Sequence, residues 1–481
     1  MLQGSNLNFA RTKILCTLGP ATSSPATLVK MIKAGMDGVR LNFSHGNFDF
    51  FDNLFLSVHE ACVEESTSLA ILADLQGPKI RIGELSEPEI QIFDGDEIEL
   101  TIDEVLGTNK VVSTSYKPLP SDARINDVIL IDDGLIKLTV SAINERSVVC
   151  KVVDGGVLKP KKGMNLPGMR LSTPSLTQKD IDNLNYLYTK HRVDFIALSF
   201  VRNASDIIEL RQWINKRGYN TPIIAKIEKP EAVDNLDEIL KVSDGLMVAR
   251  GDLGVEMKAQ EVPLIQKMII KKCNEAGKIV ITATQMLESM ISNPVPTRAE
   301  ASDVANAVWD GTDVVMLSGE TSVGKFPIKT VETMNQIVRN AGSHFDFNRT
   351  LNFESPSNFE GQLFESVNKA IVTMSREVKA SAIVVFTENG RTARGISKFK
   401  PEAKVIAISG KFETMNNLCL KWGVTSIFMK DIERDSNILI SEATKMILET
   451  GLVEHGDVVI FTSGTPVSAK GRTSTLRIFV V

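Results

Sequence analysis

Short apolar runs alternate with segments of helical periodicity through most of the chain. The first three runs, at residues 13–18, 39–44 and 69–74, are rich in aliphatic residues, and predicted helices follow the first two. A helix is also predicted at residues 178–191. Five further apolar runs come after it, at residues 195–200, 223–227, 245–248, 279–283 and 314–317. Strands that alternate with helices are typical of parallel sheets, so the pattern predicts an α/β protein.

The helical period disappears between about residue 77 and residue 168. Short alternating runs replace it, such as residues 97–102, and Asp-Gly turns separate them. This pattern predicts an inserted all-β module built from hairpins. Within it, Asp132-Asp133-Gly134 lies between two β runs and is read as a hairpin turn rather than as a metal-binding pair.

Three strands before the insertion and five after it make eight, the number in a (β/α)8 TIM barrel. A wide, open doubly wound sheet is the alternative, which the count alone does not exclude. A polar stretch at residues 344–359 ends this pattern. A second α/β set follows, with a predicted helix at 365–379 and strands at 382–386, 405–408, 458–461 and 476–481. We therefore expect a separate C-terminal α/β domain.

Composition fits a globular protein of two or three domains: the chain has 481 residues, 43% of them hydrophobic and 23% charged. The net charge of −5 argues against nucleic acid as the main partner. The five cysteines are scattered, without a C-x-x-C pair, and no apolar run has the length of a signal segment or a membrane span. These features predict a cytoplasmic protein with reduced thiols.

Polar residues gather where the predicted strands end. In a (β/α)8 barrel the carboxyl ends of the strands meet at one face, which holds the active site. So many polar groups favour a functional site over incidental surface charges, because burying them without function would be costly. In chain order they are Arg40, Asn42, Ser44, His45, Asp74, Arg81, Lys226, Glu228, Arg250, Asp252, Thr284, Gln285, Ser318 and Glu320.

Lys226, Glu228 and Asp252 define the chemistry most sharply. Lys226 and Glu228 are two residues apart, so on a strand their side chains point the same way. Glu228 and Asp252 are hard oxygen ligands suited to Mg²⁺, and Lys226 and Arg40 can neutralise a phosphoryl group in transfer. The sequence therefore predicts Mg²⁺-dependent phosphoryl transfer. Two supporting groups are predicted beside it: the backbone N–H groups near Gly251, which can meet an anion, and the hydroxyl of Thr284, which can relay a proton.

Six strings in the chain resemble those of the pyruvate kinase family. They occur in the family's order, span nearly the whole chain, and place the β insertion after the third strand. The strings are RLNFSH (40–45), DLQGPKIR (74–81), KIE (226–228), MVARGDLG (247–254), ATQMLESM (283–290) and PTRAEASDVAN (296–306). The resemblance implies a (β/α)8 barrel at 1–75 and 171–343, an inserted β-barrel lid domain at 76–170 and a C-terminal effector-binding domain at 344–481.

The resemblance also implies an activity: transfer of a phosphoryl group from phosphoenolpyruvate to ADP, giving ATP and pyruvate in the last step of glycolysis. It implies a homotetramer and a divalent metal, Mg²⁺ or Mn²⁺, held by Glu228 and Asp252. Lys226, Thr284 and Arg40 are the implied catalytic residues. The implied contacts to phosphoenolpyruvate are Arg40, Lys226, Gly251, Asp252 and Thr284, and those to the nucleotide are Asn42, His45, Arg81 and Lys162.

One departure concerns potassium. The family's monovalent cation site matches Asn42, Ser44, Asp74 and Leu75, and potassium-requiring members have a glutamate where this chain has Lys79. Our hypothesis is that the ammonium of Lys79 supplies the charge that K⁺ would bring, so that K⁺ is not required. The alternative is a lysine at the lid hinge that simply faces solvent.

A candidate effector loop lies in the C-terminal domain. Thr387, Glu388, Asn389, Gly390, Arg391 and Thr392 join a predicted strand to a helix and resemble the family's effector phosphate loop. Residues 464–473, with Lys470 and Arg472, resemble its partner loop. An ordinary strand-to-helix connection is the alternative, and the effector's identity stays open. Residues 319–325 nearly spell a P-loop, but Phe326 stands where that motif needs a hydroxyl.

Two other functions compete with the kinase. Lys226 at a strand end would suit a barrel aldolase or lyase that forms a Schiff base. Carboxylates beside it argue against this reading, because they would keep the lysine protonated. A non-catalytic sugar-phosphate sensor would need a lost catalytic residue, and every catalytic position implied by the resemblance is filled.

Overall fold

The computed structural model describes residues 9–347, 356, 358–430, 436–463 and 475–481. Within these residues, eight parallel strands close into a barrel, which confirms the predicted fold class and excludes the open sheet. The closed order is β1-β2-β3-β12-β13-β14-β15-β16. Their bounds are β1 (Lys13–Thr17), β2 (Gly38–Asn42), β3 (Ala70–Asp74), β12 (Phe195–Leu198), β13 (Ile223–Ile227), β14 (Gly245–Ala249), β15 (Ile279–Ala283) and β16 (Val314–Leu317).

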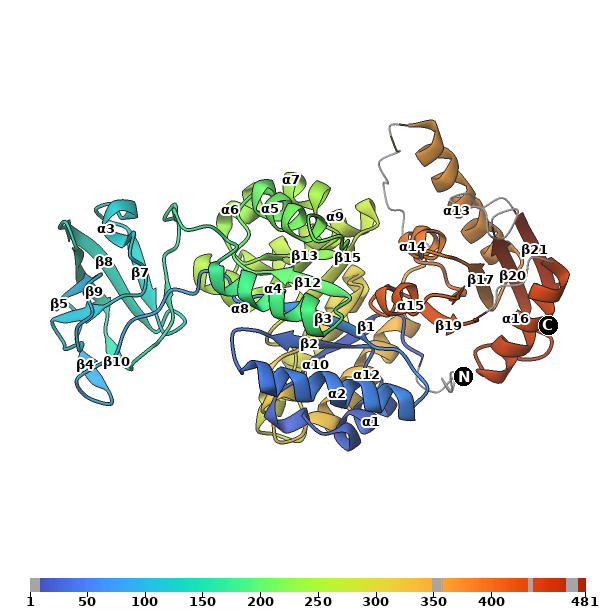
Figure 1. The fold of residues 1–481 in the computed structure, drawn as a ribbon, viewed down its shortest axis with the longest axis horizontal. Coiled ribbons are helices and arrows are strands. Elements are labelled where there is room, and N and C mark those ends of the chain that lie inside the picture. The colour runs from blue at the N-terminus through green and yellow to red at the C-terminus, as the bar shows by residue number, and fades with distance from the viewer. Residues whose placement is uncertain (1–8, 348–355, 357, 431–435, 464–474) are drawn as a thin grey trace.

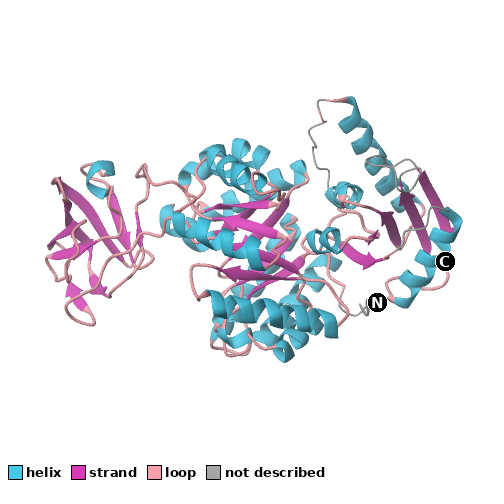
Figure 2. Ribbon diagram, in the orientation of Figure 1, coloured by secondary structure: helices cyan, strands magenta, loops and turns pink. Residues whose placement is uncertain are grey.

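Helices surround the barrel on its outer side (Figure 2). They are α1 (Pro25–Ala34), α2 (Phe48–Glu64), α4 (Gln178–Lys190), α5 (Ala204–Asn215), α6 (Pro230–Asp234), α7 (Leu236–Val242), α8 (Arg250–Glu256), α9 (Val262–Ala276), α10 (Arg298–Asp310), α11 (Gly319–Ser322) and α12 (Pro327–Ser343), with 3₁₀ turns η2 (Pro20–Thr22) and η3 (Glu288–Ile291). Local signals set several ends. In α10, Thr297 and Glu300 form a capping box at the start, and Gly311 at φ +98° ends the helix.

Two predicted strands end earlier than expected. The apolar run at 39–44 continues past β2, but the chain turns after Asn42, whose carbonyl accepts the N–H of His45 at 3.2 Å while its side-chain oxygen accepts the N–H of Ser44 at 3.1 Å. The run at 195–200 stops at Leu198, and Phe200 adopts φ +55°. In both places the chain turns at the carboxyl end of the barrel, so the polar residues that follow the strand lie at this end.

The inserted domain extends from the barrel end where β3 finishes (Figure 1). In the described chain it holds a six-stranded sheet in the order β11-β7-β8-β9-β5-β6 and a two-stranded sheet of β10 and β4. The predicted turn at Asp132–Gly134 does join two antiparallel strands. The elements are β4 (Ile90–Ile92), β5 (Glu97–Thr101), β6 (Val111–Ser113), α3 (Leu119–Asp122), β7 (Val128–Ile131), β8 (Ile136–Ile143), β9 (Ser147–Asp154), β10 (Gly156–Leu158) and β11 (Met164–Asn165).

The C-terminal domain is a sheet flanked by helices. Its described strands follow the order β19-β18-β17-β20-β21, and β21 is antiparallel to its neighbour. One of them, β19 (Val424–Phe428), was not predicted from the sequence. The predicted partner loop at 464–473 lies outside the described residues. The elements are α13 (Phe359–Glu377), β17 (Ala382–Phe386), α14 (Arg391–Lys398), β18 (Lys404–Ser409), α15 (Phe412–Leu418), β19, α16 (Ser436–Glu449), β20 (Val458–Ser463) and β21 (Thr475–Val480).

The C-terminal domain closes the amino end of the barrel. Leu420 belongs to the apolar cluster that fills the barrel interior and is fully buried there. Beside it, the buried carboxylate of Asp313 lies just before β16 and accepts the N–H of Val280 at 3.0 Å. Two lysines of the C-terminal domain face the same carboxylate, Lys400 at 2.7 Å and Lys421 at 3.8 Å. The two domains therefore share both an apolar contact and a buried charge cluster.

No helix in the described part of the chain is both long and apolar enough to cross a bilayer.

We predict that Asp313→Ala lowers stability by about 3–5 kcal/mol, because it leaves Lys400 and Lys421 buried without their carboxylate. For a domain of this size, that corresponds to a fall in melting temperature of roughly 6–20 °C. Thermal unfolding followed by circular dichroism measures it. The control is Lys329→Ala, which breaks an exposed pair with Glu332 and should cost about 1 kcal/mol or less. An Asp313→Ala protein that melts with the wild type would contradict the role of this cluster.

Candidate active site

Lys226 is the centre of the polar groups at the barrel's carboxyl end. It is the fourth residue of β13, and its side chain is buried. Its ammonium lies 2.8 Å from a carboxylate oxygen of Glu228, 3.2 Å from Asp74 and 2.7 Å from the hydroxyl of Ser199. Lys226 and Glu228 thus point the same way, as their two-residue spacing predicts.

Asp74 joins strands β2, β3 and β13 through two cations. Besides Lys226, it binds Arg40, whose Nε and Nη2 each lie 2.7 Å from the carboxylate. Burial alone would raise the pKa of Asp74, but the charges of Lys226 and Arg40 outweigh it and hold the pKa below its usual value. Arg40 also donates to the hydroxyl of Thr17 at 3.0 Å. The carboxylate therefore stays ionised and fixes both cations.

The protonation of Lys226 follows from the same cluster. Burial acts to lower its pKa, but the carboxylates of Asp74 and Glu228 raise the pKa above the ordinary value for lysine. The side chain is consequently a fixed positive charge in a site of low dielectric. Such a charge can stabilise an anion, and it is a poor nucleophile because its lone pair carries a proton.

Glu228 and Asp252 are the carboxylates available to a metal. Burial raises the pKa of Glu228, Lys226 lowers it, and the nearby charge of Asp252 raises it again. One oxygen of Glu228 accepts the N–H of Phe200 at 2.8 Å, while Asp252, in the first turn of α8, is exposed. A cation near both would relieve the repulsion between them, so the donor set fits Mg²⁺. Among the described residues no cluster of three or more His, Cys, Asp or Glu is placed to hold a metal, and water and substrate oxygens would complete the shell.

Thr284 stands directly after β15 in a strained conformation. Its φ is +65°, a region that β-branched residues rarely adopt, and Gln285 follows at φ +54°. Each such residue costs about 1–3 kcal/mol, which surrounding contacts must offset. The hydroxyl of Thr284 accepts the N–H of Gly251 at 2.8 Å and donates to the carbonyl of Ala283 at 2.6 Å. The structure therefore brings Thr284 and Gly251 together.

A group of cations lies at the rim of this cluster. Desolvation lowers the pKa of His45, and the positive charges of Lys79, Arg81, Arg40 and Lys179 lower it further, in that order. The imidazole is therefore predominantly neutral at neutral pH, while the cations around it create a field suited to phosphates. Lys162 lies in the inserted domain and pairs there with Asp132 at 2.9 Å.

Lys79 is exposed, yet it belongs to the electrostatic field of the site. Desolvation has the largest effect and lowers the pKa of Lys79. The charge of Arg81 lowers this pKa further, and the charge of Asp252 raises it. Of the residues matched to the monovalent cation site, Asp74 already binds two fixed cations, and the carbonyl of Leu75 accepts the hydroxyl of Ser199 at 2.8 Å. The side-chain oxygen of Asn42 accepts the N–H of Ser44.

Some predicted residues lie apart from this cluster. The candidate effector loop is in the C-terminal domain, on the other side of the barrel from the inserted domain (Figure 1). There, Glu388 pairs with Lys411 at 2.7 Å and Arg391 packs over the ring of Phe364. Gly390, at φ +72°, precedes α14, and its N–H is bound by the hydroxyl of Thr387 at 2.9 Å. Asn389 lies in the same connection, and Thr392 is in the first turn of α14.

Two hydroxyls that hold the cluster were not among the residues predicted from the sequence. Ser199 bonds to Lys226 and to the carbonyl of Leu75, and Thr17 bonds to Arg40. Both directly adjoin or end a barrel strand, so the strand-end rule that selected the charged residues would have found them too. Glu320, which that rule did select, is a structural residue: it is buried and accepts the N–H groups of Leu287 and Ser318.

Comparison with known proteins gives consistent matches. The family described as pyruvate kinase, barrel domain, matches residues 9–331, and the family described as pyruvate kinase, alpha/beta domain, matches residues 365–479. A pyruvate kinase of Geobacillus stearothermophilus is 42% identical over 474 residues, which cover 98% of this chain and 80% of the relative. One from Staphylococcus aureus strain MRSA252 is 42% identical over 473 residues, with the same coverage.

A solved structure is similar over nearly the whole chain. The crystal structure of a pyruvate kinase from Cryptosporidium parvum superposes with a TM-score of 0.92 at 37% identity. The match covers 98% of this chain and 96% of that one.

Proposed function

The chain belongs to the pyruvate kinase family of phosphotransferases, and from this premise we propose that it uses Mg²⁺ to transfer a phosphoryl group from phosphoenolpyruvate to ADP at the barrel's carboxyl end. One observation carries the proposal. Lys226 is buried and fixed between Asp74 and Glu228, within the field of Asp252. This arrangement places a permanent cation beside two carboxylates, the combination that phosphoryl transfer requires.

The chain's residues divide the work as follows. Lys226 and Arg40 stabilise the negative charge of the phosphoryl group as it leaves phosphoenolpyruvate. Glu228 and Asp252 would hold Mg²⁺, which would supply positive charge to neutralise the phosphoryl group. The first turn of α8, which contains Gly251, would contact the substrate, while the N–H of Gly251 itself donates to the hydroxyl of Thr284.

Protonation of the enolate completes the reaction. We assign the proton path to the hydroxyl of Thr284, which lies beside Gly251 and therefore next to the proposed substrate site. The nucleotide would lie along the rim, with its phosphates in the field of His45, Arg81 and Asn42, and Lys162 would reach it from the inserted domain. A Schiff-base lyase is disfavoured, because the carboxylates keep Lys226 protonated.

A coupled assay tests the function. The protein, with phosphoenolpyruvate, ADP and Mg²⁺, should form pyruvate and ATP in equal amounts, and removal of the divalent metal by a chelator should abolish the reaction. Mn²⁺ should restore it. A protein that turns over these substrates equally well in excess chelator would contradict the metal site at Glu228 and Asp252. Borohydride trapping with pyruvate should leave Lys226 unmodified, and a trapped adduct at Lys226 would support the lyase instead.

The variant Lys226→Met should lower kcat by about 10³-fold or more, the size expected when a charged phosphoryl clamp is removed. Methionine keeps the length and packing of the side chain while removing the charge. Circular dichroism should show a folded protein, because loss of one cation leaves Asp74 paired with Arg40. Near-normal kcat in a folded Lys226→Met protein would contradict the central role of the lysine.

We further propose that the enzyme works without K⁺, because Lys79 contributes a fixed positive charge next to the site. The wild type should be fully active in a buffer free of K⁺ and Na⁺. Lys79→Glu should lose roughly 10-fold or more, equivalent to about 1.4 kcal/mol of electrostatic stabilisation, and added K⁺ should restore the activity. The charge-reversed control Lys110→Glu, on the exposed surface of the inserted domain, should match the wild type. Strong K⁺ activation of the wild type would overturn the idea.

We also propose regulation through the C-terminal domain and assembly into an oligomer. A phosphorylated effector would bind the loop of residues 387–392, whose glycine and helix start suit a phosphate. The family suggests a homotetramer. The described cysteines are all free thiols, which agrees with the proposed cytoplasmic location.

A further inference from the structure

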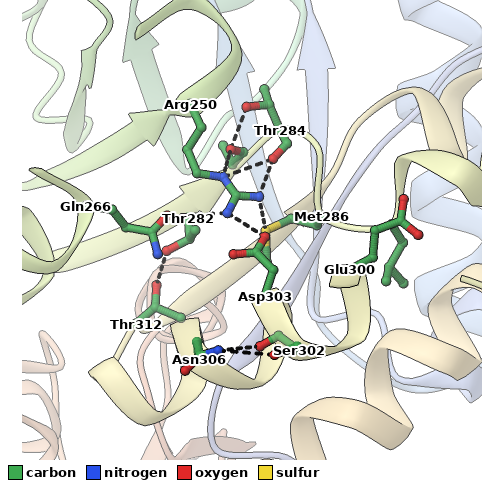
Figure 3. A network of polar contacts seen from close by, with 12 residues as sticks. Arg250, Gln266, Thr282, Thr284, Met286, Glu300, Ser302, Asp303, Asn306 and Thr312 are labelled. Atoms are coloured by element: carbon green, nitrogen blue, oxygen red, sulfur yellow. Dashed lines mark hydrogen bonds and ion pairs between the residues drawn. The ribbon is translucent and has the colours of Figure 1, made fainter. Parts of the chain in front are cut away.

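Arg250 is a strand-end residue to which the mechanism above assigns no role. It opens α8, immediately before Gly251 and Asp252, and its side chain is 10% exposed. Its guanidinium lies against the chain that leaves β15 (Figure 3).

The guanidinium spans the strained turn at Thr284. Its Nε lies 3.2 Å from the carbonyl oxygen of Ala283 and 3.1 Å from that of Thr284. Its Nη2 donates to the same Thr284 carbonyl at 2.5 Å and lies 2.8 Å from the sulfur of Met286. One planar group thus contacts three residues of a segment that contains two consecutive left-handed residues.

Two helices hold the guanidinium in this orientation. Nη1 pairs with the carboxylate of Asp303 in α10 at 2.6 Å and lies 3.4 Å from the side-chain oxygen of Gln266 in α9. A planar fork with five donors can make all these contacts at once, and an ammonium cannot. The arrangement therefore depends on arginine, and Asp303 is its ionic anchor.

Residues 250 and 251 together hold Thr284 at both ends. Arg250 binds the carbonyl of Thr284, and the N–H of the next residue, Gly251, binds its hydroxyl. The backbone and the reactive hydroxyl are therefore fixed by the same short segment that carries Asp252. A shift of the turn would move the hydroxyl relative to the substrate.

We infer that Arg250 is a positioning residue that holds Thr284 in its left-handed conformation, anchored by Asp303, so that the Thr284 hydroxyl lies on the proton path. This inference rests on the proposed function, specifically on the role given to Thr284. Arg250 acts through Thr284 and does not contact the reacting atoms.

The first test is Arg250→Lys, which keeps the charge and removes the fork. It should lower kcat about 10- to 100-fold, the size associated with a misplaced catalytic group, and leave KM for phosphoenolpyruvate and the Mg²⁺ requirement within about 3-fold of the wild type. Asp303→Asn should change kcat in the same direction and by less. A change confined to KM or to Mg²⁺ activation would show that Arg250 acts through Asp252, and would overturn the inference.

The second test is a double-mutant cycle with Thr284→Ala. If Arg250 acts through Thr284, the Arg250→Lys change should cost less than about 2-fold in kcat once the hydroxyl is gone. Equal losses in both backgrounds would overturn the inference. This comparison separates positioning from general damage, because damage to the fold would lower kcat in either background.

A third readout isolates the proton step. In D₂O with Mg²⁺ and ATP, the enzyme should exchange the methyl hydrogens of pyruvate: a C–H bond breaks, the enolate forms, and a deuteron returns to carbon. Arg250→Lys should slow this exchange by about the same factor as kcat, and an unchanged exchange rate would overturn the inference.

The matched control is Arg211→Lys. Arg211 also joins a carbonyl to a carboxylate, those of Thr221 and Asp244, but at the amino ends of β13 and β14. The turnover and exchange rates of the Arg211→Lys variant should equal those of the wild type. A loss equal to that of Arg250→Lys would overturn the inference, because it would show that any such arginine is needed.

A wild type inactive with phosphoenolpyruvate and ADP would refute the proposed function itself. An active wild type with an equally active Arg250→Lys variant would refute the positioning role alone.

Discussion

The buried ion cluster of Arg40, Asp74, Lys226 and Glu228 is the constraint on which the site depends. Two cations and two carboxylates alternate in space, so each charge faces an opposite one. Removing Lys226 would leave Glu228 buried without its cation, which is more costly than losing an exposed pair, while Asp74 would keep Arg40. The cluster joins β2, β3 and β13, so it forms only when the barrel is assembled. The same assembly that completes the fold therefore also sets the protonation of Lys226.

The two ends of the barrel use charge differently. At the amino end, Asp313 and its lysines are buried between two domains, and Leu420 fills the interior beside them. That end is closed, and its buried charges are not accessible to a ligand. At the carboxyl end, the buried cluster borders exposed groups such as Asp252 and His45. Charges there remain accessible to a ligand, which is why we propose the active site at this end.

Features that depend on the local periodicity of hydrophobic residues were predictable from the sequence. Features that depend on contacts between residues far apart in the chain were not. Eight apolar runs predicted the barrel strands, and the two-residue spacing predicted that Lys226 and Glu228 point the same way. The pairing of Lys226 with Asp74 joins residues 152 positions apart (226 − 74), and no local pattern encodes it. Strand β19 was missed because it is an edge strand with partly exposed Thr425 and Ser426, so its apolar run is broken. The direction of the Arg250 side chain depends on where α8 begins, which the sequence left open.

The site consists of a part formed during folding and a part left for the substrate to complete. Lys226, Asp74 and Glu228 are desolvated and mutually oriented before any ligand binds, so the cost of burying them is met by the stability of the barrel. The strained turn at Thr284 belongs to the same part, because contacts from α8 already hold it. Asp252, His45 and Lys79 remain exposed to solvent. Binding of anionic ligands therefore needs to displace water mainly from this second set, while the first provides a field that requires little reorganisation.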